Sequence, residues 1–148
     1  MKKYILFSIF SSCFLFATTK RKDDQPRLEL KSIRNGVVFD VPLKEDKKVE
    51  TKLNDGKSLT LYQDKQGNKF HSKSDIFIRF KTKISKTRLK EIEKNYSLQL
   101  KEINLIGDYR FKNRGEKDTV TLINLIIKKE GQNLIRIYPN KTLNLIKR

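Results

Sequence analysis

The stretch "SDIFIRFKTKISKTRLKEIEKNYSLQL", residues 74–100, joins two different patterns end to end. In its first part Ile76, Ile78 and Phe80 fall on one side of an extended chain, which predicts a strand with one buried face. The apolar residues that follow recur at the spacing of a helix: Leu89, Ile92 and Tyr96. The stretch therefore predicts a strand followed directly by a short amphipathic helix.

Polar residues mark the expected ends of this helix and of a second one. Ser85 is placed to cap the start of the first helix. Asp118 is placed to cap a second helix over residues 119–130. Gly131 follows at the position where a glycine often ends a helix.

Three more strands are expected in the second half, near residues 98–100, 109–112 and 134–138. The resulting order, β-α-β-β-α-β, is that of the ferredoxin-like fold, one four-stranded antiparallel sheet with both helices on one face. The opposite sheet face stays uncovered, so it is either solvated or an interface. Because the apolar residues of the first strand point towards the helices, Phe77 and Arg79 are expected on the uncovered face.

Residues 36–73 are expected to form a small β-rich extension in front of this domain. A short strand over residues 36–42 is expected to stop at Pro42. Two turns are expected after it, at Asp55-Gly56 and at residues 64–69. The predicted fold class is therefore α+β, a ferredoxin-like domain preceded by a β-rich extension.

The N-terminal segment predicts export. Lys2 and Lys3 precede an apolar run, residues 4–17, that is too short to span a bilayer and has the length of a signal-peptide core. We favour cleavage over lipidation at Cys13, because the apolar run continues past the cysteine. The mature protein is expected in the periplasm or outside the cell, without stable membrane insertion. The expected segments are a signal peptide (1–19), a flexible lead (20–35), the β-rich extension (36–73), the ferredoxin-like domain (74–140) and a C-terminal tail (141–148).

The chain is strongly basic. It holds 34 Lys and Arg against 17 Asp and Glu, for a formal net charge of +17. An anionic partner is one interpretation of this excess, and compositional drift is the other. We favour drift, because the charges are scattered along the chain and a nucleic-acid surface usually clusters them. No nucleic-acid partner is expected.

Residues suited to catalysis are scarce. His71 is the only histidine and lies in a turn-rich loop. No serine-centred glycine elbow, metal-ligand spacing or glycine-rich phosphate loop is present in the sequence. The sequence therefore predicts a protein that is not an enzyme and has no cofactor or metal site.

The second half also resembles a known family, the N-terminal prodomains of subtilisin-like serine proteases. Phe80-Lys81 matches the end of the first strand of these prodomains, and the run from Tyr96 to Leu98 matches their "Y-x-L". The closing strand "LIRIYPN", residues 134–140, is similar to their V-x-x-A-E-P-N type. The resemblance covers residues 74 to about 146, half of the chain.

The resemblance implies a chaperone and inhibitor that docks its open sheet face on two parallel surface helices of the protease. The family's two helix-capping acidic positions fall here on Tyr138 and Asn140, and the tyrosine departs from the acidic pattern. The tail would then enter the active-site cleft as an extended strand. The expected protease-binding residues are Phe77, Arg79, Tyr138, Asn140, Leu143, Leu145 and Ile146.

The expected function is therefore that of an exported, non-catalytic chaperone and inhibitor of a subtilisin-like serine protease. Because no catalytic domain follows the resemblance, it is expected to act on a separate protease. Two alternatives stay open: an exported basic module that binds an anionic surface or polymer, and an inactive remnant of a split protease gene.

Overall fold

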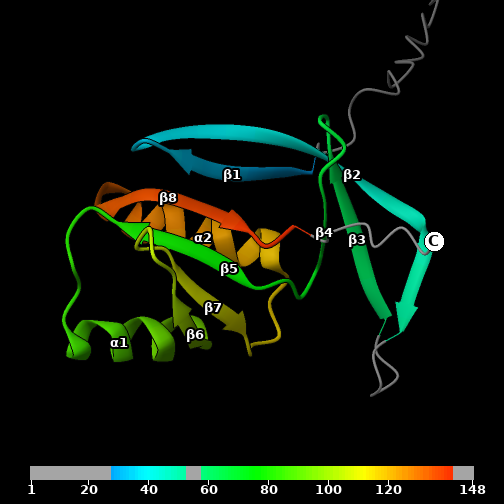
Figure 1. Cartoon of the computed structure of the whole chain (residues 1–148). Coiled ribbons are helices and arrows are strands. Elements are labelled where there is room, and N and C mark those ends of the chain that lie inside the picture. The colour runs from blue at the N-terminus through cyan, green and yellow to red at the C-terminus, as the bar shows by residue number, and fades with distance from the viewer. Residues whose placement is uncertain (1–27, 53–57, 142–148) are drawn as a thin grey trace, which may run out of the picture.

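The computed structural model describes residues 28–52 and 58–141, without the side chains of 46–52 and 58. The described chain forms one eight-stranded sheet with two helices (Figure 1). The strands are β1 (Glu29–Arg34), β2 (Val37–Lys52), β3 (Ser58–Asp64), β4 (Lys69–His71), β5 (Ile76–Phe80), β6 (Leu98–Ile103), β7 (Tyr109–Asn113) and β8 (Leu134–Pro139). The helices are α1 (Lys86–Tyr96) and α2 (Thr119–Glu130), and a short 3-10 turn, η1 (Gly131–Asn133), follows α2.

The predicted ferredoxin-like fold is wrong. All strand pairs are antiparallel and follow the order β4-β3-β2-β1-β8-β5-β7-β6, so the sheet is twice as wide as expected and curls (Figure 1). The N-terminal strands are not a separate extension, because β1 pairs with β8 at Ile33 and Ile137. The protein is therefore a curled antiparallel sheet with two helices.

Strand β1 joins the two halves of the sheet and lies in the segment expected to be a flexible lead. Leu30 and Ile33 are 4% and 0% exposed. Asn124 of α2 fixes the strand from the side: its Oδ1 accepts from the Lys31 amide at 2.7 Å, and its Nδ2 donates to the Glu29 carbonyl at 3.0 Å. The burial of these two side chains and the hydrogen bonds from α2 therefore stabilise a strand in a segment whose charged residues suggest a solvated chain.

Strand β2 continues past Pro42, where the sequence predicted a stop. Proline lacks an N–H group and therefore breaks a ladder of hydrogen bonds only where that group is needed. Pro42 lies opposite Glu29 at the end of the β1 pairing, and Leu43 already pairs with Asp64 of β3. The proline thus occupies the point where β2 changes partner.

The two predicted turns of the first half have different outcomes. Asp55-Gly56 lies outside the described residues, although β2 and β3 pair on either side of it. The turn at residues 64–69 is confirmed: Gly67 has φ +82°, and Asp64 Oδ1 accepts from the Asn68 amide at 2.8 Å. A left-handed φ of this kind favours glycine.

The predicted helices and their N-caps are confirmed. Ser85 Oγ accepts from the Arg88 amide at 3.1 Å, and Asp118 Oδ1 accepts from the Val120 amide at 2.7 Å. Gly131 follows α2 as expected, but with φ −51° it continues into η1 instead of turning left-handed. The left-handed end belongs to α1, at Ser97 with φ 51°.

The outermost strand of the second half, β6, is irregular. Leu100 pairs with Phe111 and Glu102 with Arg110, so Lys101 is an extra residue that forms a bulge. The carboxylate of Glu93, on α1, accepts from the Leu100 amide at 2.7 Å. At the other edge of the sheet, β4 has only three residues.

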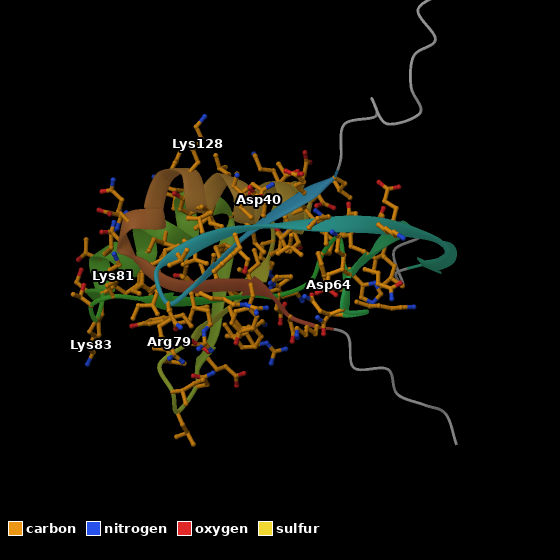
Figure 2. The ribbon with its side chains drawn as sticks, turned by 90° about the horizontal axis from the view of Figure 1, so that it is seen from above. Asp40, Asp64, Arg79, Lys81, Lys83 and Lys128 are labelled. Atoms are coloured by element: carbon orange, nitrogen blue, oxygen red, sulfur yellow. The ribbon has the colours of Figure 1, made fainter. Side chains whose placement is uncertain are left out.

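The core lies between the sheet and the two helices. Ile76 and Ile78 are fully buried, and Phe80 packs against the same cluster. The predicted register of β5 is therefore confirmed, because Phe77 and Arg79 must point to the other side. Figure 2 shows this arrangement from above, with Lys128 of α2 on one side of the sheet and Arg79 on the other.

Candidate interaction face

One side of the sheet is covered by neither helix. Because Ile33, Ile137 and Ile78 point to the helices, the residues that alternate with them point away. We define the open face by seven of these residues on four neighbouring strands: Ser32, Arg34, Arg136, Tyr138, Phe77, Arg79 and Arg110. Four arginines and two aromatic residues thus share one surface.

An aromatic pair occupies the middle of the open face. Phe77 and Tyr138 lie directly opposite each other on β5 and β8, and their rings stack with centroids 5.2 Å apart at 13°. The guanidinium of Arg110 lies 5.9 Å from the Phe77 ring centroid, within the range of a cation–π contact. Cross-strand pairs of this kind stabilise a sheet and hold both rings in one orientation.

A buried carboxylate holds the polar residues of the face in place. Asp108 is 0% exposed and accepts from Arg79 Nε at 2.6 Å and from the Tyr138 hydroxyl at 3.2 Å. Arg136 Nη1 lies 3.9 Å from the same carboxylate. Burial, together with the negative charge of Asp108, raises the pKa of Tyr138, so this hydroxyl stays a proton donor.

Arg110 is fixed in the same way at the other side of Phe77. Its Nε donates to Asp75 at 2.8 Å and its Nη1 donates to Glu102 at 3.2 Å. These ion pairs neutralise part of the positive charge and order the guanidinium on the ring. The open face is therefore a preformed surface rather than a set of loose side chains.

A groove of about 330 Å³ lies between β1 and β8 at the edge of the open face. Its charged lining is entirely basic: Arg34, Arg136 and Lys141. The remaining lining residues are Ser32, Ile33, Asn35 and Tyr138. The groove has the charge to accept an anionic group.

The structure brings three of the expected binding residues together, because Phe77, Arg79 and Tyr138 all contribute to the open face. Asn140 follows β8, and its amide donates to the Asp75 carbonyl at 2.7 Å. The remaining three expected residues, Leu143, Leu145 and Ile146, lie outside the described residues. Tyr138 was expected at a position that caps a partner's helix, but its hydroxyl already donates to Asp108 within the protein.

Sequence reasoning missed Arg136, Arg110 and Asp108. The first two had a usable pattern, because Arg136 and Tyr138 flank the buried Ile137 on β8, and Arg110 lies between the buried Tyr109 and Phe111 on β7. Asp108 lies at the end of a turn, where an acidic residue is ordinary. Its burial depends on two other strands, so no local pattern marks it.

Residues 28–52 and 58–141 contain no group of three or more potential metal ligands. In the same ranges no helix is long and apolar enough to cross a membrane. His71 ends β4 and is half-buried.

Comparison with known proteins gives no match to this chain, whether with protein-family models, with curated proteins or with solved structures.

Proposed function

We propose that this protein is an exported, non-catalytic docking protein that binds a subtilisin-like serine protease as a chaperone and inhibitor. The open face is the observation that carries the docking part of the proposal. The choice of protease rests on the resemblance of residues 74–146 to subtilisin prodomains. The tail, residues 141–148, is proposed to enter the active-site cleft.

The composition of the open face supports a protein partner. Tyrosine and arginine are enriched among the residues that dominate binding energy in interfaces. Here Tyr138 and Arg79 are held by Asp108 before any partner arrives. A preformed surface loses less side-chain entropy on binding, which favours affinity.

The proposal is tested by measuring inhibition of the subtilisin-like proteases secreted by the source organism. Phe77→Ala removes a half-buried ring from the centre of the face, so binding should weaken about five- to thirtyfold, the effect of losing about 1–2 kcal/mol. Val38→Ala is the matched control, because Val38 is 49% exposed and points to the helix side beside Ile33. Equal inhibition by the two variants would exclude the open face as the docking surface.

Removing residues 141–148 separates docking from inhibition. The shortened chain should still bind the protease through the open face but should no longer block the cleft, since extended inhibitory segments act by lying in it as a substrate does. Inhibition unchanged by this truncation would remove the tail from the mechanism.

The basic groove favours a second candidate function, binding of an anionic polymer. Arg34, Arg136 and Lys141 present three cations around one concavity. In this case Arg136→Ala should weaken binding to heparin, while Lys128→Ala, on the opposite side of the sheet, should not. Submicromolar, Arg136-dependent heparin binding near about 150 mM salt would place this function above the first.

A further inference from the structure

Three connections of the chain meet at one end of the sheet. The β1–β2 turn reaches β8 through a hydrogen bond from the Gly36 amide to the Ile135 carbonyl, 3.0 Å. The β5–α1 loop starts beside it, with the Lys81 amide donating to the Asn133 carbonyl at 2.9 Å. The β6–β7 turn follows, because Tyr109 pairs with both Ile78 and Ile103. We name this part of the molecule the loop end (left in Figure 1).

The β6–β7 turn is rigid. Asn104 Oδ1 accepts from the amides of Ile106 and Asp108 at 3.2 and 2.8 Å. The Gly107 amide donates to the Asn104 carbonyl at 3.0 Å, and Gly107 has φ +86°. In Figure 2 the turn projects beyond the sheet on the side of Arg79. A well-ordered turn is thus held out into solvent.

This turn presents aliphatic side chains to water. Leu105 is 108% exposed, Ile106 61% and Ile103 53%. Just after the β1–β2 turn, Val37 and Phe39 on the open side of the sheet are 55% and 48% exposed, and Val38 on the helix side is 49% exposed. Single exposed apolar residues need no explanation, but several gathered at one end indicate an interaction site.

The charge at the loop end is positive. Lys81 and Lys83 are exposed on the β5–α1 loop and form no ion pair with any other described residue. The acidic residues nearest to the turn are occupied, because Asp108 is buried under Arg79 and Glu102 pairs with Arg110. Exposed aliphatic groups beside exposed lysines match an anionic lipid surface, in which apolar chains lie below negative phosphates.

We propose that the loop end docks peripherally on an anionic phospholipid bilayer, with Leu105 and Ile106 entering the boundary of the acyl chains and Lys81 and Lys83 contacting lipid phosphates. A bilayer fits better than a protein pocket because the aliphatic residues Leu105 and Ile106 project from a turn into solvent, and the exposed aromatic residue at this end, Phe39, lies on β2 and not on the turn. The proposal is independent of the open face and of the protease.

The test uses the absence of tryptophan from the sequence. The protein used is residues 20–148, which include every described residue. In it, Leu105→Trp places a single fluorescent reporter at the tip of the turn. With vesicles of phosphatidylcholine and phosphatidylglycerol the emission should shift to the blue and be quenched by bromine-labelled acyl chains. With pure phosphatidylcholine vesicles neither change should occur.

Thr121→Trp, on the exposed side of α2, is the matched control. The full chain has a formal net charge of +17, and residues 20–148 lack only two of its charged residues, Lys2 and Lys3. So basic a protein adsorbs to anionic vesicles by any face, so sedimentation with vesicles does not show which face binds. Only insertion at the loop end makes Leu105→Trp respond while Thr121→Trp does not. In a further pair, Leu105→Asp should weaken vesicle binding about tenfold or more, and Thr121→Asp, which adds the same charge elsewhere, should weaken it less.

Three outcomes would overturn the proposal. The first is an unchanged Leu105→Trp spectrum with anionic vesicles, which would leave a protein pocket as the target of the turn. The second is an equal blue shift at Thr121→Trp, which would indicate adsorption without a preferred face. The third is equal vesicle binding by Leu105→Asp and Thr121→Asp.

Discussion

At the scale of single residues, Asp108 decides the shape of the open face. One buried carboxylate orients a guanidinium from β5 and a hydroxyl from β8, and a second guanidinium, Arg136, lies 3.9 Å away. Burying a carboxylate without partners is costly, so the stability of the folded protein depends on these partners being in place. Arg79 depends on the carboxylate equally, because Asp108 accepts from its Nε, while its Nη2 is buried without an acceptor.

Replacing this carboxylate should therefore destabilise the whole protein. Asp108→Asn removes the negative charge from beside Arg79, whose side chain is only 22% exposed, so the free energy of unfolding should fall by about 3–5 kcal/mol. Asp40→Asn is the matched control, because the Lys31–Asp40 pair is exposed and such pairs contribute about 0–1 kcal/mol. Urea unfolding measures the free energy of unfolding of both variants. A similar decrease in the two would show that the Asp108 carboxylate contributes no more to stability than an exposed ion pair.

At the scale of elements, a polar contact links the two helices over the core. Glu130, at the end of α2, accepts from Arg88 Nη2 at 2.6 Å and from the Tyr96 hydroxyl at 3.2 Å, both on α1. Both helices also contribute apolar residues to the same core, for example Ile92 of α1 and Ile123 of α2. This contact therefore sets how α1 lies relative to α2.

The contact should make stability depend on alkaline pH. Burial and the Glu130 carboxylate raise the pKa of Tyr96 from 10.0 to about 12. The unfolded chain therefore loses this proton first, so the stabilisation is complete below about pH 10 and is lost as pH rises towards 12. Tyr96→Phe has no proton to lose, so its urea midpoint should fall less between these pH values than that of the unchanged protein. Parallel midpoints for both proteins would contradict this assignment.

Elements with local determinants were predictable from the sequence. The spacing of apolar residues and the caps at Ser85 and Asp118 define both helices without help from the rest of the chain. The alternation of Ile76 and Ile78 likewise determines which side of β5 is buried. These local patterns predicted the helices and strands over most of residues 75–139. They also predicted that Phe77 and Arg79 lie on the open face.

Elements with long-range determinants were not predictable. Strand β1 is stabilised by Asn124, more than ninety residues away, and by pairing with β8 at the far end of the chain. Its own sequence offers only Leu30 and Ile33 among polar and charged residues. The continuation of β2 through Pro42 depends in the same way on where its neighbours begin and end.

At the scale of the whole molecule, β1 should be indispensable. Residues 74–140 alone, the predicted independent domain, lack the buried side chains of Leu30 and Ile33, and the loss of their burial should cost about 3–6 kcal/mol. A loss of that size is comparable to the stability of a small domain, about 5–15 kcal/mol. The fragment should therefore give no cooperative urea transition by circular dichroism, whereas residues 28–148 should. A cooperative transition in the fragment would restore the predicted domain boundary.

The bulge at Lys101 has a consequence for the behaviour of concentrated solutions. An open strand edge is a template on which a second molecule can add a strand, and repeated addition leads to fibrils. On β6 the Glu93 carboxylate occupies the Leu100 amide and the bulge interrupts the row of backbone groups, while β4 offers only three residues at the opposite edge. Neither border of the sheet accepts a long, regular neighbour. Both features should hinder self-templated growth of so wide a sheet, and Glu93→Ala would free the Leu100 amide on β6 while leaving the bulge in place.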